Sequence, residues 1–72
     1  MFFYADLKEN ENSDAHAVQI NMNQVAKITM RRKDGARLYE FFSAHGISLG
    51  KKEIMESNVQ EISHMEEVIS RG

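Results

Sequence analysis

The sequence contains no cysteine and no proline. Without cysteine the chain has no disulfide, no thiolate zinc site and no thiol nucleophile. Without proline, no edge strand of a sheet carries the residue that most simply blocks further strand pairing. These two absences exclude thiol enzymes and cysteine-based zinc modules, and they remove the covalent cross-link that often reinforces a small domain.

Length and composition predict one small globular domain. The chain has 72 residues, which leaves room for a single domain at residues 1–72. A chain of this size buries only about 60% of the surface that its unfolded form exposes, so a partner would reinforce it. Hydrophobic residues make up 42% and charged residues 28%, which is typical of a soluble folded domain.

Long apolar runs are also missing. No run approaches the roughly 18 residues that a membrane span needs, and residues 1–6 lack a basic leader before their apolar stretch. We therefore expect a cytoplasmic protein with no membrane partner.

The charge is small overall but unevenly distributed. The net charge of −2 gives no global attraction to nucleic acid or to an anionic membrane. Residues 27–52 carry seven basic and two acidic side chains, which is +5, and the remaining residues supply the balance of −7. Any contact with a polyanion must therefore be local and must involve the basic middle of the chain.

The first third of the chain predicts two strands. Residues 2–7 alternate in the way of a strand, with Phe3, Ala5 and Leu7 on one side. Residues 8–14 are polar and break the alternation, so they form a loop. Alternation resumes over residues 17–22, and a turn is expected near Asn23 because asparagine tolerates tight backbone conformations.

The clearest local signal is Asp34-Gly35, which supplies the two positive-φ positions of a type I′ hairpin turn. A two-residue loop fixes the register, pairing Lys33 with Ala36 at the turn and Lys27 with Phe42 at the far end. One face of this hairpin then carries Ile28, Met30, Tyr39 and Phe41, and the other carries Lys27, Thr29, Arg31, Leu38, Glu40 and Phe42.

The last third predicts a strand and a helix. Residues 47–55 form a further strand, in which Gly50 indicates a bulge or a close backbone approach. Ser57 and Gln60 have the spacing of a capping box, so a helix begins there. Its apolar arc comprises Val59, Ile62, Met65, Val68 and Ile69, of which Val59, Ile62, Met65 and Ile69 are expected to pack on the sheet.

Together these elements predict an α+β domain with a small antiparallel sheet of four or five strands, meander-like, and one C-terminal amphipathic helix. Their order resembles that of the small bacterial flagellar proteins of the FlbD type. The matching residues are Ile20-Asn21-Met22-Asn23, Val25, Ile28, Asp34-Gly35, Leu38, Glu56-Ser57, Gln60-Glu61-Ile62 and Val68-Ile69. Residues 17–49 also resemble half of a LytTR-type DNA-binding domain. Neither resemblance implies a catalytic residue.

Candidate catalytic and metal sites are weak. His16, His45 and His64 lie 29 and 19 residues apart, and this is not the spacing of a metal site. Glu66-Glu67 is expected to lie on a solvated helix face, and no glycine pattern indicates a phosphate-binding loop. We therefore expect no enzyme activity, no catalytic residue, no metal, no cofactor and no small-molecule substrate.

The basic hairpin tip is one candidate binding site. It comprises Arg31, Arg32, Lys33 and Arg37. Arg32 lies directly opposite Arg37, and like charges at such positions are relieved by a phosphate or a carboxylate. Two-stranded ribbons can enter the major groove of DNA, so the tip could contact nucleic acid or an acidic protein surface. The alternative is a tip that is charged only to stay solvated.

Leu38 and Phe42 form the other candidate. They project from the face opposite Tyr39 and Phe41, and one helix can cover only one face of a small sheet. A second copy is the usual cover for the other face, although both residues could instead lie under the loop at 8–14. The sequence therefore predicts a non-enzymatic protein-interaction module that self-associates as a homodimer. A nucleic-acid-binding regulator that uses the basic tip is the alternative.

Overall fold

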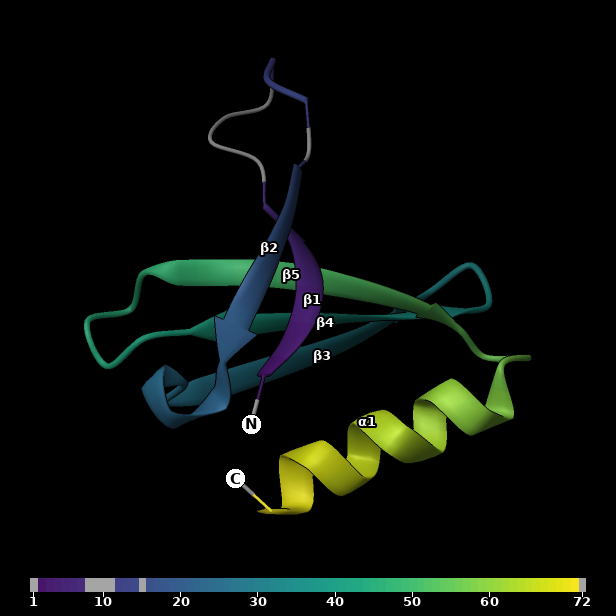
Figure 1. The fold of residues 1–72 in the computed structure, drawn as a ribbon. Helices are drawn as coiled ribbons and strands as arrows, with labels where there is room; N and C mark the ends of the chain where they lie inside the picture. Colours follow the sequence, from purple (N-terminus) through teal and green to yellow (C-terminus); the bar gives the residue numbers. More distant parts are fainter. Residues whose placement is uncertain (1, 8–11, 15, 72) are drawn as a thin grey trace.

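A computed structural model of the chain describes residues 2–7, 12–14 and 16–71 (Figure 1), and side chains are described for residues 4–7, 12–14 and 16–70. The predicted α+β fold is confirmed, with a five-stranded antiparallel sheet and one C-terminal helix. The elements in chain order are β1 (Phe2–Leu7), β2 (His16–Asn21), the 3₁₀ helix η1 (Met22–Gln24), β3 (Lys27–Lys33), β4 (Ala36–Phe42), β5 (Ser48–Met55) and α1 (Val59–Arg71).

The strand order is β2-β1-β5-β4-β3. The strands β3, β4 and β5 form a meander, and β1 and β2 form a separate hairpin. The two units join where β1 lies beside β5, with Asp6 opposite Lys51. In Figure 1 the β1–β2 hairpin crosses β4 and β5 at a steep angle. The helix α1 lies below these strands in the same view.

The β3–β4 hairpin forms as predicted. Asp34 and Gly35 have φ values of 52° and 79°, the left-handed values that a type I′ turn needs. Lys33 pairs with Ala36 and Lys27 with Phe42, so the whole predicted register is confirmed. The local turn chemistry therefore decides which side chains of β3 and β4 share a face.

Gly50 combines both of its predicted roles. The register between β4 and β5 shifts between Phe41 and Phe42, which is a β-bulge beside Gly50. A Cβ atom on Gly50 would lie 3.1 Å from Ile20 Cδ1, 3.2 Å from Val18 Cγ2 and 3.3 Å from Ala5 Cβ. The missing side chain therefore lets the β1–β2 hairpin pack directly on the backbone of β5.

The core lies between this hairpin, one face of β4 and β5, and the helix. Phe41 and Ile54 are the most completely buried large side chains, at 0% and 1% exposure. The other buried members of the cluster are Ala5, Ile20, Met22, Tyr39, Ile62, Met65 and Val68. Tyr39 and Phe41 thus occupy the face that α1 covers, as the hairpin register requires.

The start of the helix differs from the prediction in two ways. The N-cap is Asn58 and not Ser57, because the Glu61 amide donates to Asn58 Oδ1 at 3.2 Å and Asn58 Nδ2 donates to Glu61 Oε2 at 2.9 Å. Val59 was expected to pack on the sheet, but it is 71% exposed, since the first turn of α1 projects its side chain into solvent. The contact with the core is made by Ile62, Met65 and Val68, with Ile69 at its border.

The connection between β2 and β3 follows the prediction for Asn23. The 3₁₀ helix η1 occupies this position, and the side chain of Asn21 accepts a hydrogen bond from the Asn23 amide at 3.0 Å. The predicted loop at 8–14 is described only at residues 12–14, and its residues 8–11 lie outside the described part of the chain. Within the described residues, no helix is long and apolar enough to cross a membrane.

Candidate functional site

The four basic residues of the hairpin tip divide between the two faces of the sheet. Residues directly opposite in an antiparallel pair project to the same side. Arg32 lies opposite Arg37, which shares a face with Tyr39 and α1, whereas Arg31 lies opposite Leu38 on the other face. Lys33, opposite Ala36, joins Arg31 there. The tip is therefore two separate basic pairs.

The pair on the helix side is matched by carboxylates. Glu56 Oε1 lies 3.3 Å from Arg37 Nε and 3.5 Å from Arg32 Nε, so one carboxylate bridges the two like charges. Glu66 Oε1 lies 2.9 Å from Arg37 Nη1 and adds a second counter-charge from α1. The sequence predicts that a counter-charge reduces the repulsion between Arg32 and Arg37. The chain itself supplies this counter-charge through Glu56 and Glu66, which the sequence did not identify as partners.

Arg37 is the centre of this network. Its side chain is 14% exposed, and its Nη1 also donates to the hydroxyl of Tyr39 at 3.3 Å. Hydrogen bonds to Tyr39, Glu66 and Glu56 raise the pKa of Arg37 above the ordinary value for arginine, and the bond to Tyr39 contributes most. Arg37 is therefore a charged link between β4 and α1, with Glu56 and Glu66 as its counter-charges.

The basic pair on the face opposite α1 consists of Arg31 and Lys33. Arg31 and Lys33 are both solvent-exposed. Among the residues with described side chains, the ion pairs of the structure involve Arg32, Arg37 and Lys52, and neither Arg31 nor Lys33 takes part. These two cations lie beside Leu38 and Ala36, so the predicted basic site and the predicted self-association site meet on one surface.

We call this surface the open face. It is the side of the β3–β4–β5 meander opposite α1, and its residues are Lys27, Thr29, Arg31, Lys33, Ala36, Leu38, Glu40, Phe42, Ser48, Lys51, Glu53 and Met55.

The apolar part of the open face follows β4. Leu38 and Phe42 are half-buried, and Met55 on β5 is 53% exposed. Lys27 Nζ lies 4.7 Å from the centre of the Phe42 ring, which is a cation–π contact. A hollow of about 310 Å³ near the turn is lined by Lys33, Asp34, Ala36, Leu38, Glu53 and Met55. The face therefore carries apolar side chains on β4 and β5, with Glu40 between Leu38 and Phe42 and further charged side chains on both sides.

The elements that cover β4 and β5 lie on the other side. The helix reaches the sheet through Glu66 on Arg37 and Glu61 on Lys52. The β1–β2 hairpin packs over Gly50, which lies opposite Phe41 and therefore on the helix side. Among the described residues, neither α1 nor this hairpin covers the open face. The interpretation in which the loop at 8–14 covers Leu38 and Phe42 involves residues 8–11, which lie outside the described part.

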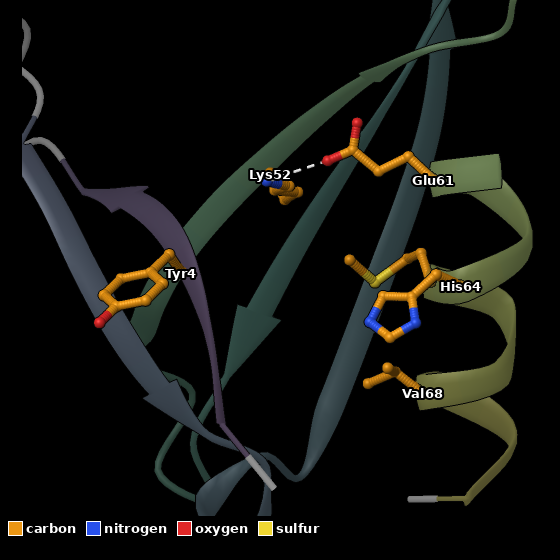
Figure 2. A pocket seen from close by; sticks show the side chains of 6 residues that line it. Tyr4, Lys52, Glu61, His64 and Val68 are labelled. Atoms are coloured by element: carbon orange, nitrogen blue, oxygen red, sulfur yellow. Dashed lines mark ion pairs between the residues drawn. The ribbon is translucent and has the colours of Figure 1, made fainter. Parts of the chain in front are cut away.

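A second hollow lies between α1 and the sheet (Figure 2). It has a volume of about 230 Å³ and is lined by Tyr4, Lys52, Glu61, His64, Met65 and Val68. Lys52 Nζ and Glu61 Oε1 form an ion pair at 3.3 Å across its upper end, so its cation already has a counter-charge. Ligand pockets usually measure about 300–1,000 Å³, and this hollow is smaller. It lies between the helix and the side chains of Tyr4 and Lys52.

The three histidines lie on separate elements. His16 is on β2, His45 is in the turn before β5, and His64 is on α1. Within the described residues, no three histidine, aspartate or glutamate side chains come close enough together to hold a metal ion.

Sequence reasoning missed the β5 side of the open face. Glu53 lies opposite Leu38, and Met55 lies opposite Ala36. Alternation along β5 could have found them, but the bulge beside Gly50 hides the register between β4 and β5.

In comparisons with known proteins, no protein family, no curated protein and no solved structure matches this chain. The resemblances to FlbD-type proteins and to LytTR-type domains therefore stay predictions.

Proposed function

We propose that this protein is a non-enzymatic interaction module that self-associates through the open face. The observation that supports this function best is that other elements of the chain pack on only one face of the β3–β4–β5 meander among the described residues. The helix and the β1–β2 hairpin both pack on the Tyr39 side, while Leu38, Phe42 and Met55 line the side opposite α1. A sheet with apolar side chains on both faces gains stability when both faces are covered.

Because the chain is short, covering the open face with a second copy would also add to a small core. A domain of 72 residues has a small core, and a second copy adds apolar burial to it without lengthening the chain. Leu38 and Phe42 lie on the middle strand of the meander, on either side of Glu40, so a second sheet could pack over them across both neighbouring strands.

Contact with nucleic acid is the second candidate function. It is favoured by the three cations of β3 that project from the open face, Lys27, Arg31 and Lys33. The pairing of Arg32 and Arg37 with carboxylates weakens it, because half of the basic tip is then directed to the protein itself. Self-association uses the apolar side chains of the open face as well as its charges, and it is therefore the function we propose.

Sedimentation velocity tests the proposal over a range of protein concentrations. We expect the wild-type protein to sediment as a species of twice the 8.3 kDa chain mass, and Leu38→Asp to sediment as a folded monomer. Met30→Asp is the matched control, since Met30 is also an exposed apolar residue of the hairpin, at 44%, but lies on the helix side. A wild-type monomer at every concentration, or an unchanged Leu38→Asp dimer, contradicts the proposal.

A further inference from the structure

Three residues of the open face lie at one level across the meander. Arg31 on β3 is directly opposite Leu38 on β4, and Leu38 is directly opposite Glu53 on β5. All three side chains therefore project to the same side, in the order cation, apolar residue, anion. With strands about 4.8 Å apart, the backbones of Arg31 and Glu53 lie about 10 Å from each other along this row.

Both charges of this row are exposed and outside the ion pairs of the described side chains. Those ion pairs use Glu56, Glu61 and Glu66 with cations on the helix side of the sheet. Arg31 and Glu53 are solvent-exposed. Arg31 and Glu53 form no ion pair with each other among the described side chains, so each charge can take a counter-charge from a second molecule.

A row in the order cation, apolar residue, anion is complementary to itself. Consider a second copy generated by a rotation of 180° about an axis that is parallel to β4 and passes above Leu38. Its row lies directly over the first row, but with the cation and the anion in exchanged positions. The same rotation places Leu38 over its own copy and, in the next row, Glu40 over its own copy, with Lys51 of each copy beside it. Two-fold symmetry of this kind requires one patch to match itself, and this row meets that requirement in the order of its charges.

We propose that a second copy of this chain packs on the open face with its two-fold axis parallel to β4 at Leu38. Arg31 of each copy then faces Glu53 of the other, and the two Leu38 side chains meet between these ion pairs. This arrangement rests on the self-association proposed above and specifies its geometry. Two sheets packed face to face keep their strands within about 30° of each other, so the rows near the axis stay matched.

The competing two-fold arrangement is unfavourable. An axis perpendicular to the strands lays β3 of one copy over β3 of the other. With the axis at Leu38, that sets Arg31 over Arg31 of the second copy and Glu53 over its Glu53. The parallel axis instead places β3 over β5 of the second copy. The neighbouring row then sets the aliphatic stem of Lys33 over Met55, which is apolar contact at the rim of the interface.

The test exchanges the two charges and mixes the variants. Arg31→Glu leaves only acids at the ends of the row, and Glu53→Arg leaves only bases. Each variant alone should dissociate, with a dimer dissociation constant raised at least about tenfold. An equimolar mixture should regain the dimer mass, because the two copies then face each other with opposite charges in both positions. The double variant Arg31→Glu/Glu53→Arg should also form a homodimer.

The control mixture combines Lys51→Glu with Glu53→Arg. Lys51 belongs to the same face but to the level of Thr29 and Glu40, so Lys51→Glu should form its own dimer and should not restore dimerisation of Glu53→Arg. Far-UV circular dichroism of each variant checks that it remains folded. If Leu38→Asp dissociates the wild-type dimer but the charge variants do not, or their mixture does not recover, the arrangement is wrong while the open face remains the interface. If the wild-type protein never dimerises, the proposed function and this geometry both fail.

Discussion

Arg37 Nη1 lies 2.9 Å from Glu66 Oε1, and this ion pair joins the meander to α1. The same side chain contacts Tyr39 and Glu56 and is 14% exposed, whereas Arg32 opposite it has one contact at 3.5 Å and is 66% exposed. Solvent screens exposed ion pairs and leaves them with little net effect on stability. The two arginines of this like-charged pair therefore contribute unequally.

We expect Arg37→Met to lower the melting temperature by several degrees and Arg32→Met to leave it nearly unchanged. Loss of Arg37 leaves the hydroxyl of Tyr39, a residue that is 2% exposed, without its donor, and it separates Glu66 from the sheet. Thermal unfolding followed by circular dichroism measures both variants at one protein concentration. Equal melting temperatures for the two variants would show that the network around Arg37 does not stabilise the fold.

Gly50→Ala should destabilise the protein more than Gly46→Ala. Both glycines have positive φ, 149° and 78°, so both substitutions strain the backbone. A Cβ atom on Gly50 also meets Ile20, Val18 and Ala5 at 3.1–3.3 Å, whereas nothing lies within 4 Å of one on Gly46. Overpacking of this kind costs about 1–3 kcal/mol, and this is the expected difference between the two variants. Urea unfolding at fixed protein concentration measures it, and similar midpoints would contradict the close packing of the β1–β2 hairpin on β5.

Asn58→Ala should lower the free energy of unfolding by about 1 kcal/mol, because it removes the N-cap of α1. Ser57→Ala is the matched control, since Ser57 is exposed and precedes the cap. Urea unfolding of the two variants decides between the two capping residues. A larger loss for Ser57→Ala would return the helix start to the position that the sequence analysis assigned.

Local chemistry explains which parts of the fold the sequence predicts. The register of the β3–β4 hairpin depends on two adjacent residues, Asp34 and Gly35, whose turn type leaves only one pairing. The helix start is ambiguous locally, because Ser57 with Gln60 and Asn58 with Glu61 both have capping-box spacing. The hydrogen bond from the Asn58 amide to the Met55 carbonyl closes the turn after β5 and favours the second pair.

Long-range pairing explains what the sequence does not predict. Glu56 and Glu66 reach Arg37 across 19 and 29 residues, and no local pattern marks them as its partners. The place of Glu53 beside Leu38 depends likewise on a pairing between strands with a bulge in it. The sequence therefore identifies the candidate cations of β3 and β4. It does not identify Glu56 and Glu66, the acids that pair with Arg32 and Arg37 and leave Arg31 and Lys33 exposed.

The last prediction separates self-association from nucleic-acid binding on the open face. We expect no retardation of labelled single-stranded or double-stranded DNA at physiological salt, because the net charge is −2 and Arg32 and Arg37 are paired with carboxylates. Electrophoretic mobility of the labelled strands measures this over a salt series. Retardation that falls steeply with salt and is abolished by Arg31→Glu/Lys33→Glu, but not by Arg32→Glu, would assign the open face to nucleic acid. The division of the tip makes this comparison informative, since all three residues lie within one short stretch of β3 but only Arg31 and Lys33 project from the open face.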